Sequence, residues 1–369
     1  QILIKASNGA SDFGNKFGQP LICGSVLTFE YHANEKVFAY DKVIMLAGGV
    51  AYANADYAQK KIPGQGDRIV LLGGDNYRIV MGGGAVSSVA TCEFGHQIDL
   101  NAVQRSNPEM QKRVCNAIRA LAESESNPII SIHDHGAGGH LNCLSELVEQ
   151  TGGFIEIQKL PVGDPTLSSK EIIGNESQER MGLVLHEEDI PLLQRIARRE
   201  RAPMYDVGFV TGDQQFTFSD KDGLKPIDLQ LKDMFGNPPK TILRDETRPL
   251  KFPEPRYRRE YFEDYLADVL QLESIACKDW LTNKVDRSVT GRVAKQQTCG
   301  TYQLPLNNLA VVALDYCTRK GIATALGHAP AAGMVDPENG SVLSIAEALT
   351  NIIWAPLQDG LNGISLSAN

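Results

Sequence analysis

Short apolar runs bounded by glycine or charged residues recur along this chain and constrain its fold more than any other feature. Runs of this length predict buried β-strands. Between them lie amphipathic stretches with apolar residues at helical spacing. The alternation of the two patterns excludes an all-α bundle and an all-β sandwich. The predicted strands are residues 43–46, 69–72, 128–132, 181–185 and 310–314, and the predicted helices include 108–121, 141–148, 189–201 and 344–353.

Composition narrows the class of protein further. The 369 residues are 42% hydrophobic, which suits two or three domains with real cores. The formal net charge of −9 argues against a general binder of nucleic acid or of membrane surfaces. No apolar run approaches the roughly 18 residues that span a bilayer, and we expect no signal peptide. Seven scattered cysteines without a Cys-x-x-Cys pair are typical of reduced thiols in a cytoplasmic protein.

The ends and the middle of the chain indicate its organisation. Prolines interrupt residues 236–262, which predicts an extended linker between two globular parts, and helical periodicity resumes over 261–277. Residues 1–5 read as part of a strand, and residues 363–369 alternate like another strand. We expect both ends to be cut from a longer chain.

The stretch at 132–140 reads Ile-His-Asp-His-Gly-Ala-Gly-Gly-His between a predicted strand and a predicted helix. Its glycines would let backbone N–H groups approach a phosphate at the positive end of the helix. Asp134 would end the strand, where a carboxylate can hold Mg²⁺ beside that phosphate. The alternatives are a tight structural turn in which Asp134 caps backbone groups, and a metal site that uses His133 and His135.

Other polar stretches carry ligand-like groups with structural alternatives. Residues 175–180 read Asn-Glu-Ser-Gln-Glu-Arg, which is either a solvated loop or a set of hydrogen-bonding groups for a polyhydroxylated ligand. Glu347 and Asn351 share one face of a predicted helix, where they either hold Mg²⁺ or form an exposed stripe. The glycines at 73–74 and 82–84 let the backbone pass close to a ligand or to another strand. No Walker P-loop and no serine-hydrolase elbow is present.

These stretches, in this order, resemble the large phosphoribosylformylglycinamidine synthases, also called formylglycinamide ribonucleotide amidotransferases. The resemblance implies an internal fragment with an α+β fold, built from two-domain units like those of aminoimidazole ribonucleotide synthetase. Residues 1–62 would end the first N-terminal sheet domain, 63–237 would form its C-terminal α/β domain, 238–275 would be the linker and 276–369 would start the second unit. The matching stretches are residues 13–20, 44–49, 82–88, 103–110, 133–139, 175–180, 198–203, 286–291, 347–351 and 366–369.

The activity that the resemblance implies is a ligase reaction of de novo purine biosynthesis. Such an enzyme uses ATP and Mg²⁺ to convert formylglycinamide ribonucleotide to formylglycinamidine ribonucleotide through a phosphorylated amide, an iminophosphate. The ammonia would come from a glutaminase domain of the same full-length chain. We expect this fragment alone to lack full activity and to self-associate. The alternatives are a non-catalytic nucleotide-binding scaffold and another ATP-dependent member of the same superfamily.

The resemblance also implies roles for individual residues, none of them a protein nucleophile. Asn308 stands where the family has aspartate, so we expect weaker Mg²⁺ binding there, and Lys284 differs in type from the family's residue. The implied Mg²⁺ ligands are Asp134 at the catalytic nucleotide and Asn308, Glu347 and Asn351 at a structural nucleotide. The implied substrate contacts are Gln104, Glu176, Ser177 and Gln178, and the implied contacts to the structural nucleotide are Lys284 and Asn307.

Overall fold

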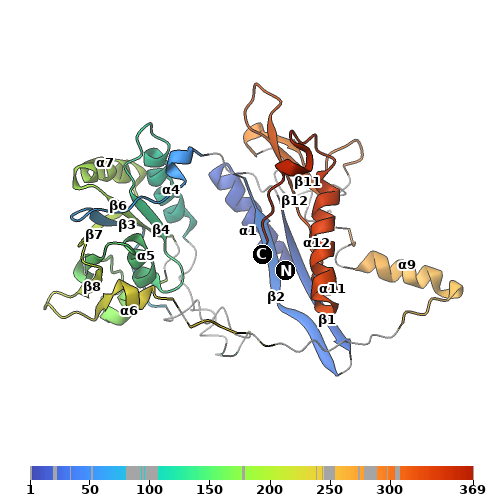
Figure 1. Cartoon of the computed structure of the whole chain (residues 1–369), viewed down its shortest axis with the longest axis horizontal. Coiled ribbons are helices and arrows are strands. Elements are labelled where there is room, and N and C mark those ends of the chain that lie inside the picture. Colours follow the sequence, from blue (N-terminus) through green and yellow to red (C-terminus); the bar gives the residue numbers. More distant parts are fainter. Residues whose placement is uncertain are drawn as a thin grey trace. The chain divides into compact units, whose positions relative to one another are not determined.

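The chain divides into two compact units in the computed structural model (Figure 1). Residues 53–243 form one, here called the sheet unit, and residues 1–52 with 244–369 form the other, here called the split unit. The structure describes residues 2–19, 23–33, 35–50, 53–79, 93, 95, 107–176, 179–237, 239–242, 244, 254–272, 275–277, 289–296, 298–303 and 308–368.

A seven-stranded sheet forms the centre of the sheet unit. Its strand order is β4-β6-β3-β7-β5-β8-β9, and every neighbouring pair is antiparallel except β5 with β8. The strands are β3 (Arg68–Leu72), β4 (Ser131–Asp134), β5 (Gly153–Glu156), β6 (Met181–Leu185), β7 (Met204–Val210), β8 (Gln215–Ser219) and β9 (Ile227–Gln230).

Helices cover both faces of this sheet, as Figure 1 shows. Successive strand residues point to opposite faces, so β3 feeds two cores. Val70 and Leu72 pack with α4 (Pro108–Ala122) and α7 (Ile190–Glu200). Ile69 and Leu71 pack in the other core, to which α5 (Gly139–Leu147) and α6 (Ser169–Ile173) contribute. These four apolar side chains of β3 are all 0% exposed, which explains a continuous apolar run without alternation.

Local signals in the sequence set the helix ends of the sheet unit. The Asn107 side chain accepts a hydrogen bond from the Met110 N–H and so caps α4. Ser168 and Glu171 form a reciprocal capping box at α6. Asp189 occupies the N-cap position of α7 as the sequence predicts, but its side chain makes no capping hydrogen bond. A short helix, α8 (Leu231–Met234), follows β9.

The split unit contains a hairpin and a second, smaller sheet. The hairpin pairs β1 (Cys23–Ala33) with β2 (Lys36–Gly48), and the sheet has the antiparallel order β10-β11-β12. The sheet strands are β10 (Val293–Lys295), β11 (Leu309–Ala313) and β12 (Gly321–Ala325). The helices are α1 (Ile2–Phe17), α9 (Phe262–Gln271), α11 (Pro330–Val335) and α12 (Pro337–Ile352).

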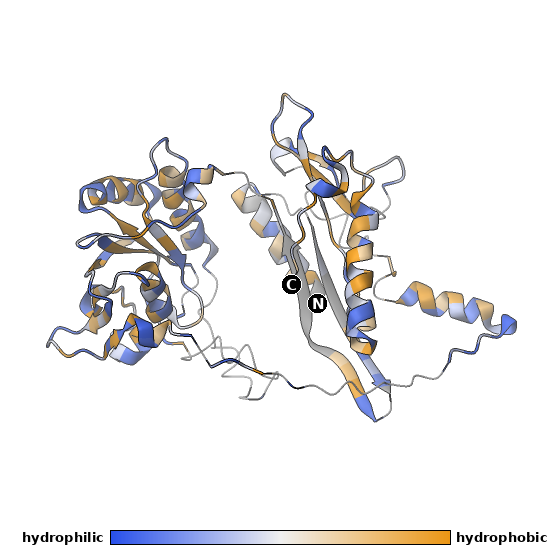
Figure 2. Ribbon diagram, in the orientation of Figure 1, coloured by the Kyte–Doolittle hydropathy of each residue, from blue (hydrophilic) through white to orange (hydrophobic). Residues whose placement is uncertain are grey.

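Helices and sheets together confirm the α+β prediction, and Figure 2 shows apolar residues along the buried strands of the sheet unit. The strand predictions at 69–72 and 181–185 agree with β3 and β6. Strand β4 begins three residues later than predicted. Ile129 and Ile130 are buried although they precede the strand, so the apolar run extends beyond it. Among the helices within these described ranges, none is long and apolar enough to cross a membrane.

Both predictions of strands at the chain ends are wrong. Residues 2–17 form helix α1, in which Phe13 and Phe17 stack at 4.4 Å between ring centroids, one helical turn apart. The apolar run at 2–4 is too short to distinguish a strand from a helix. Residues 360–363 form a 3₁₀ turn, and the described residues after it, 364–368, form no strand. Helix α12 starts seven residues before its predicted start, because Asp336 caps it through the N–H groups of Glu338 and Asn339.

Candidate functional site

The turn between β4 and α5 lies directly against Asn175 and Glu176, the first two residues of the polar stretch at 175–180. Gly138 and Gly139 have φ values of 83° and 60°, in the left-handed region that glycine tolerates best. A Cβ atom added to Gly139 would lie 2.4 Å from the carbonyl oxygen of Asn175. The glycines therefore let two polar stretches, 38 residues or so apart in sequence, meet in space.

Glu176 fastens this contact from the other side. Its Oε1 accepts a hydrogen bond from the Gly138 N–H at 3.1 Å, and the residue is 1% exposed. The N-terminal end of α5 offers a positive dipole that stabilises a buried carboxylate there. One backbone donor that the sequence assigned to a phosphate is thus occupied by a protein carboxylate, and Glu176 acts as a strap between the two loops.

Asp134 ends β4 with its side chain 70% exposed. Its Oδ1 atom lies 3.5 Å from Nδ1 of His133, and among the described residues no backbone N–H donates to it. The structure therefore does not support the alternative in which Asp134 caps the glycine turn. An exposed carboxylate at the end of a strand has the oxygen ligands that Mg²⁺ prefers.

The two histidines that flank Asp134 lie in different surroundings. His133 forms an ion pair through Nε2 with Glu146, and its Nδ1 lies 2.9 Å from the Asp134 carbonyl oxygen. His135 is 1% exposed and turns into the interior. In the part of the chain that the structure describes, no group of three or more His, Cys, Asp or Glu residues can hold a metal ion, so the structure does not support a His133/His135 site.

A buried polar cluster lies behind the two loops, and sequence reasoning missed it. Arg180 is 0% exposed and donates from Nε to the Gly74 carbonyl oxygen at 2.7 Å. Its Nη1 lies 2.9 Å from Nε2 of His140, and its Nη2 lies 3.5 Å from Oδ1 of Asn175. Nε2 of His135 lies 2.8 Å from Nδ1 of His140. A buried guanidinium therefore joins three segments of the sheet unit.

The first of the glycines at 73 and 74 makes room for this arginine. Gly73 has a φ of 131°, and a Cβ added to it would lie 2.6 Å from Cγ of Arg180. The sequence left open whether these glycines approach a ligand or another strand. The structure shows that Gly73 admits the side chain of Arg180, the residue before β6, whereas a Cβ on Gly74 would lie 3.2 Å from Oε1 of Glu179.

The two buried histidines are neutral. Burial is the largest cause that lowers the pKa of His140, followed by His135 and Arg180. Burial, then the Arg180 charge, lowers the pKa of His135. Burial also lowers the pKa of Arg180 to about 10, so that the guanidinium still carries its charge at neutral pH. One cation beside two uncharged imidazoles is therefore the state of this cluster.

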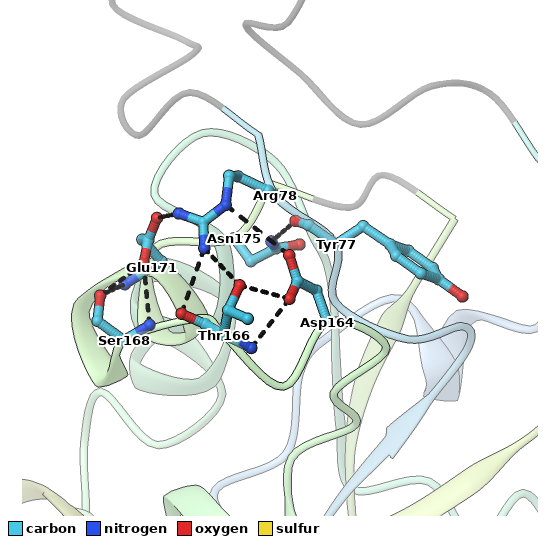
Figure 3. A network of polar contacts seen from close by, with 7 residues as sticks. All are labelled: Tyr77, Arg78, Asp164, Thr166, Ser168, Glu171 and Asn175. Carbon is cyan, nitrogen blue, oxygen red and sulfur yellow. Dashed lines mark hydrogen bonds and ion pairs between the residues drawn. The ribbon is translucent and has the colours of Figure 1, made fainter.

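A second polar cluster holds residues 77–78, which precede the glycine-rich stretch at 82–88 in sequence (Figure 3). Arg78 pairs with Glu171 and donates from Nη2 to Oγ1 of Thr166 at 2.8 Å. Asn175 donates from Nδ2 to the Tyr77 carbonyl oxygen at 2.8 Å. The segments at 77–78 and 175–176 are thereby held side by side.

The implied Mg²⁺ ligands of the split unit gather at one end of its small sheet. Glu347 accepts from the His328 N–H at 2.9 Å, and Asn351 donates from Nδ2 to the Leu326 carbonyl oxygen at 3.4 Å. Leu309, the first residue of β11, pairs with Ala325, the last residue of β12. Asn308, which precedes β11, therefore lies at the end of the sheet where β12 ends. The register thus places Asn308 beside the end of β12, and Glu347 and Asn351 hydrogen-bond to residues that follow β12.

Five predicted site residues lie outside the described residues: Gln104, Ser177, Gln178, Lys284 and Asn307. The glycine-rich stretch at 82–88 and the first part of 286–291 lie outside them as well. Their roles stay predictions.

Two family models match the chain. Residues 64–221 match the C-terminal domain of AIR synthase related proteins, and residues 277–369 match the FGAR-AT PurM_N-like domain. The chain is 39% identical to the phosphoribosylformylglycinamidine synthases of Dictyostelium discoideum over 382 residues and of Homo sapiens over 389 residues. Both alignments cover 100% of this chain but only 28% and 29% of those relatives, so the chain spans just over a quarter of their length.

Solved structures show the same fold. The structure titled T. maritima PurL complexed with FGAR matches with a TM-score of 0.64 at 20% identity, over 94% of this chain and 52% of that chain. The ATP complex of that protein matches with a TM-score of 0.64 at 18% identity, over 95% and 51%. These likenesses confirm the predicted aminoimidazole ribonucleotide synthetase-like fold.

Proposed function

This chain belongs to the phosphoribosylformylglycinamidine synthase family, and from that premise we propose that it carries part of the synthetase site of an ATP-dependent ligase. The proposed reaction converts formylglycinamide ribonucleotide to formylglycinamidine ribonucleotide in purine biosynthesis. Relatives with this name align over the whole chain, and solved PurL structures of the same fold are titled as complexes with FGAR and with ATP.

The contact between residues 134–140 and residues 175–180 is the observation that carries the proposal. Asp134 presents an exposed carboxylate on one side of it. Glu176 and Asn175 hold the other side in a fixed place through Gly138 and Tyr77. Transfer of a phosphoryl group needs positioning and neutralisation of charge more than a protein nucleophile. An oxygen ligand for a cation beside polar residues that hydrogen bonds hold in place meets that need.

The donor chemistry of this chain fits Mg²⁺ at both predicted sites. Asp134 supplies an exposed carboxylate, and Glu347 with the amide side chains of Asn308 and Asn351 supplies oxygen atoms at the end of the small sheet. Bound Mg²⁺ would neutralise the phosphate oxygens of ATP. The chain's own residues orient the substrates, and Ser177, Gln178 and Gln104 would contact the ribonucleotide.

The remaining parts of the proposal concern the longer protein. Ammonia would come from a glutaminase domain elsewhere in that protein, so this chain by itself would lack glutamine-dependent activity. We also expect this chain by itself to self-associate. We place the protein in the cytoplasm, although one plant relative is named chloroplastic/mitochondrial. The family models at 64–221 and 277–369 support domains at 63–237 and 276–369, with 1–62 and 238–275 as the end of a sheet domain and a linker.

The test uses the full-length protein that contains this chain. We expect phosphate release from ATP that depends on both formylglycinamide ribonucleotide and free ammonia. Asp134→Asn should lower that rate roughly 100-fold, because it removes a charged ligand of the metal. Asp222→Asn is the matched control, since Asp222 lies in an exposed turn of the sheet unit after β8. Nucleotide binding without substrate-dependent release would favour the scaffold alternative instead.

A further inference from the structure

The guanidinium of Arg180 closes the polar loop at 175–180 at its base. Arg180 stands at one end of this loop and Asn175 at the other, and Nη2 of the first lies 3.5 Å from Oδ1 of the second. Asn175 also donates to the Tyr77 carbonyl oxygen, which fixes that end to the neighbouring segment. Glu176 and Glu179, just inside the two ends, are 1% and 6% exposed. Both described ends of the loop are therefore buried and lie close together.

His140 accepts the hydrogen bond that sets the plane of this guanidinium. Arginine has only donors, so the Arg180 Nη1 atom must donate to Nε2 of His140 across their 2.9 Å separation. Nε2 therefore carries no proton, and the proton of the neutral ring lies on Nδ1. The Asn76 side chain also lies 3.2 Å from Nε2, and with this tautomer its amide must turn its NH2 group toward that atom. That Nδ1–H faces Nε2 of His135 at 2.8 Å, which accepts it. A relay of two imidazoles thus orients the acceptor for Arg180.

A shorter or apolar side chain at position 140 cannot place an acceptor where Nε2 of His140 lies. It is 0% exposed, and its helix α5 starts at the glycine turn that Glu176 straps down. Arg180 is fully buried as well. Water therefore cannot freely replace a lost acceptor, and the loss costs free energy. Without His140, the guanidinium keeps its bond to Gly74 but loses one of the contacts that orient it toward Asn175.

We propose that His140, supported by His135, is a positioning residue that holds Arg180 and so keeps the 175–180 loop in the shape that binds the ribonucleotide substrate. This inference rests on the proposed function, because it assigns the loop to that substrate. When the loop is already ordered, less of the free energy of substrate binding is lost in ordering it. Loss of His140 should therefore lower the affinity for the substrate. His140 touches neither the substrate nor ATP in this account.

The test compares two substitutions of His140 in the full-length protein. His140→Leu removes the acceptor at similar volume, whereas His140→Gln places an amide oxygen near the position of Nε2. We expect His140→Leu to raise the KM for formylglycinamide ribonucleotide at least about tenfold, the loss expected for a hydrogen bond to a charged group. The KM for ATP should change less than about threefold, and His140→Gln should recover most of the affinity.

A control on the same helix separates positioning from packing. Cys143 is 0% exposed on α5, and its Sγ donates to the His133 carbonyl oxygen, so Cys143→Ala should lower the melting temperature without raising the substrate KM. An unchanged KM in His140→Leu, or an equal rise in Cys143→Ala, would overturn the inference. If His140→Leu does not fold, His140→Asn takes its place, because its side chain is too short to reach Arg180.

Hydrogen exchange provides a readout that does not depend on the reaction. Peptides that cover residues 172–182 should exchange faster in His140→Leu than in Cys143→Ala, because Arg180 has lost its hydrogen bond to His140. Equal exchange in the two variants would contradict the positioning role. A different result is a wild-type protein without substrate-dependent phosphate release, together with faster exchange in His140→Leu. That result would support the positioning role and contradict the proposed function.

Discussion

The Glu176 carboxylate accepts a hydrogen bond from the Gly138 N–H at 3.1 Å, across 38 residues of sequence. This bond joins the loop that carries Asp134 to the loop that carries the predicted substrate contacts. Because the Glu176 carboxylate is 1% exposed, its replacement removes a hydrogen bond to a charged group that joins the two loops. The strap therefore contributes both to stability and to the geometry of the site.

Substitution of Glu176 tests the strap. Glu176→Gln keeps an oxygen acceptor, so we expect a loss of about 1 kcal/mol in the free energy of unfolding, and Glu176→Ala should lose about 2–3 kcal/mol. Urea denaturation of the full-length protein, followed by a probe in the sheet unit, measures the difference. The control Glu187→Ala removes an exposed carboxylate from the turn before α7 and should stay within about 0.5 kcal/mol of wild type. Equal effects of the two Glu176 substitutions would argue against the hydrogen bond.

Gly139→Ala tests the close approach of the two loops. Its positive φ costs an alanine about 1–2 kcal/mol, and the clash with the Asn175 carbonyl adds about 1–3 kcal/mol. Gly223→Ala is the matched control, because Gly223 has a φ of 77° but nothing within 4 Å of an added Cβ. Urea midpoints should fall clearly further for Gly139→Ala than for Gly223→Ala. Similar midpoints would mean that strain in φ alone accounts for the glycine.

The buried histidines predict a loss of stability at mildly acidic pH. Burial lowers the folded-state pKa of His140, whereas the unfolded chain binds a proton near pH 6.5. The stabilising contribution is therefore fully present above about pH 6.5 and falls as the pH drops below it. His140→Gln removes that titration, so its urea midpoint should depend less on pH between 7.5 and 5.5 than that of wild type. A steeper dependence in the variant would contradict the neutral state of the ring.

Thiol reactivity should differ sharply among the cysteines. Burial raises the pKa of the Cys143 thiol well above its ordinary range, and its Sγ donates to the His133 carbonyl oxygen at 3.4 Å. Cys277 and Cys317 are exposed. At pH 7.5, a thiol reagent should modify the two exposed cysteines first, and Cys143 only after urea unfolds the sheet unit. Peptide mapping checks the order, and rapid modification of Cys143 in the native protein would show that α5 opens.

Local sequence signals predict the strands and helices of the sheet unit, but not its buried cluster. The apolar runs at 69–72 and 181–185 agree with β3 and β6, because a strand covered on both faces needs no alternation. Asn107 and Pro108 mark the start of α4. By contrast, Arg180 ends a polar run, and such a residue is usually solvated. Its burial depends on Gly73, Gly74 and His140, which are distant in sequence and give no periodic signal.

Isotope transfer tests the central claim most directly. The full-length protein would turn over ATP, free ammonia and formylglycinamide ribonucleotide labelled with ¹⁸O at the amide oxygen that is replaced. If that oxygen attacks the γ-phosphorus and then leaves with the phosphate, the released phosphate carries ¹⁸O in step with product. We predict such labelled phosphate from wild type and from Asp222→Asn, and very little from Asp134→Asn. Unlabelled phosphate at the same yield of product would contradict phosphorylation of the amide.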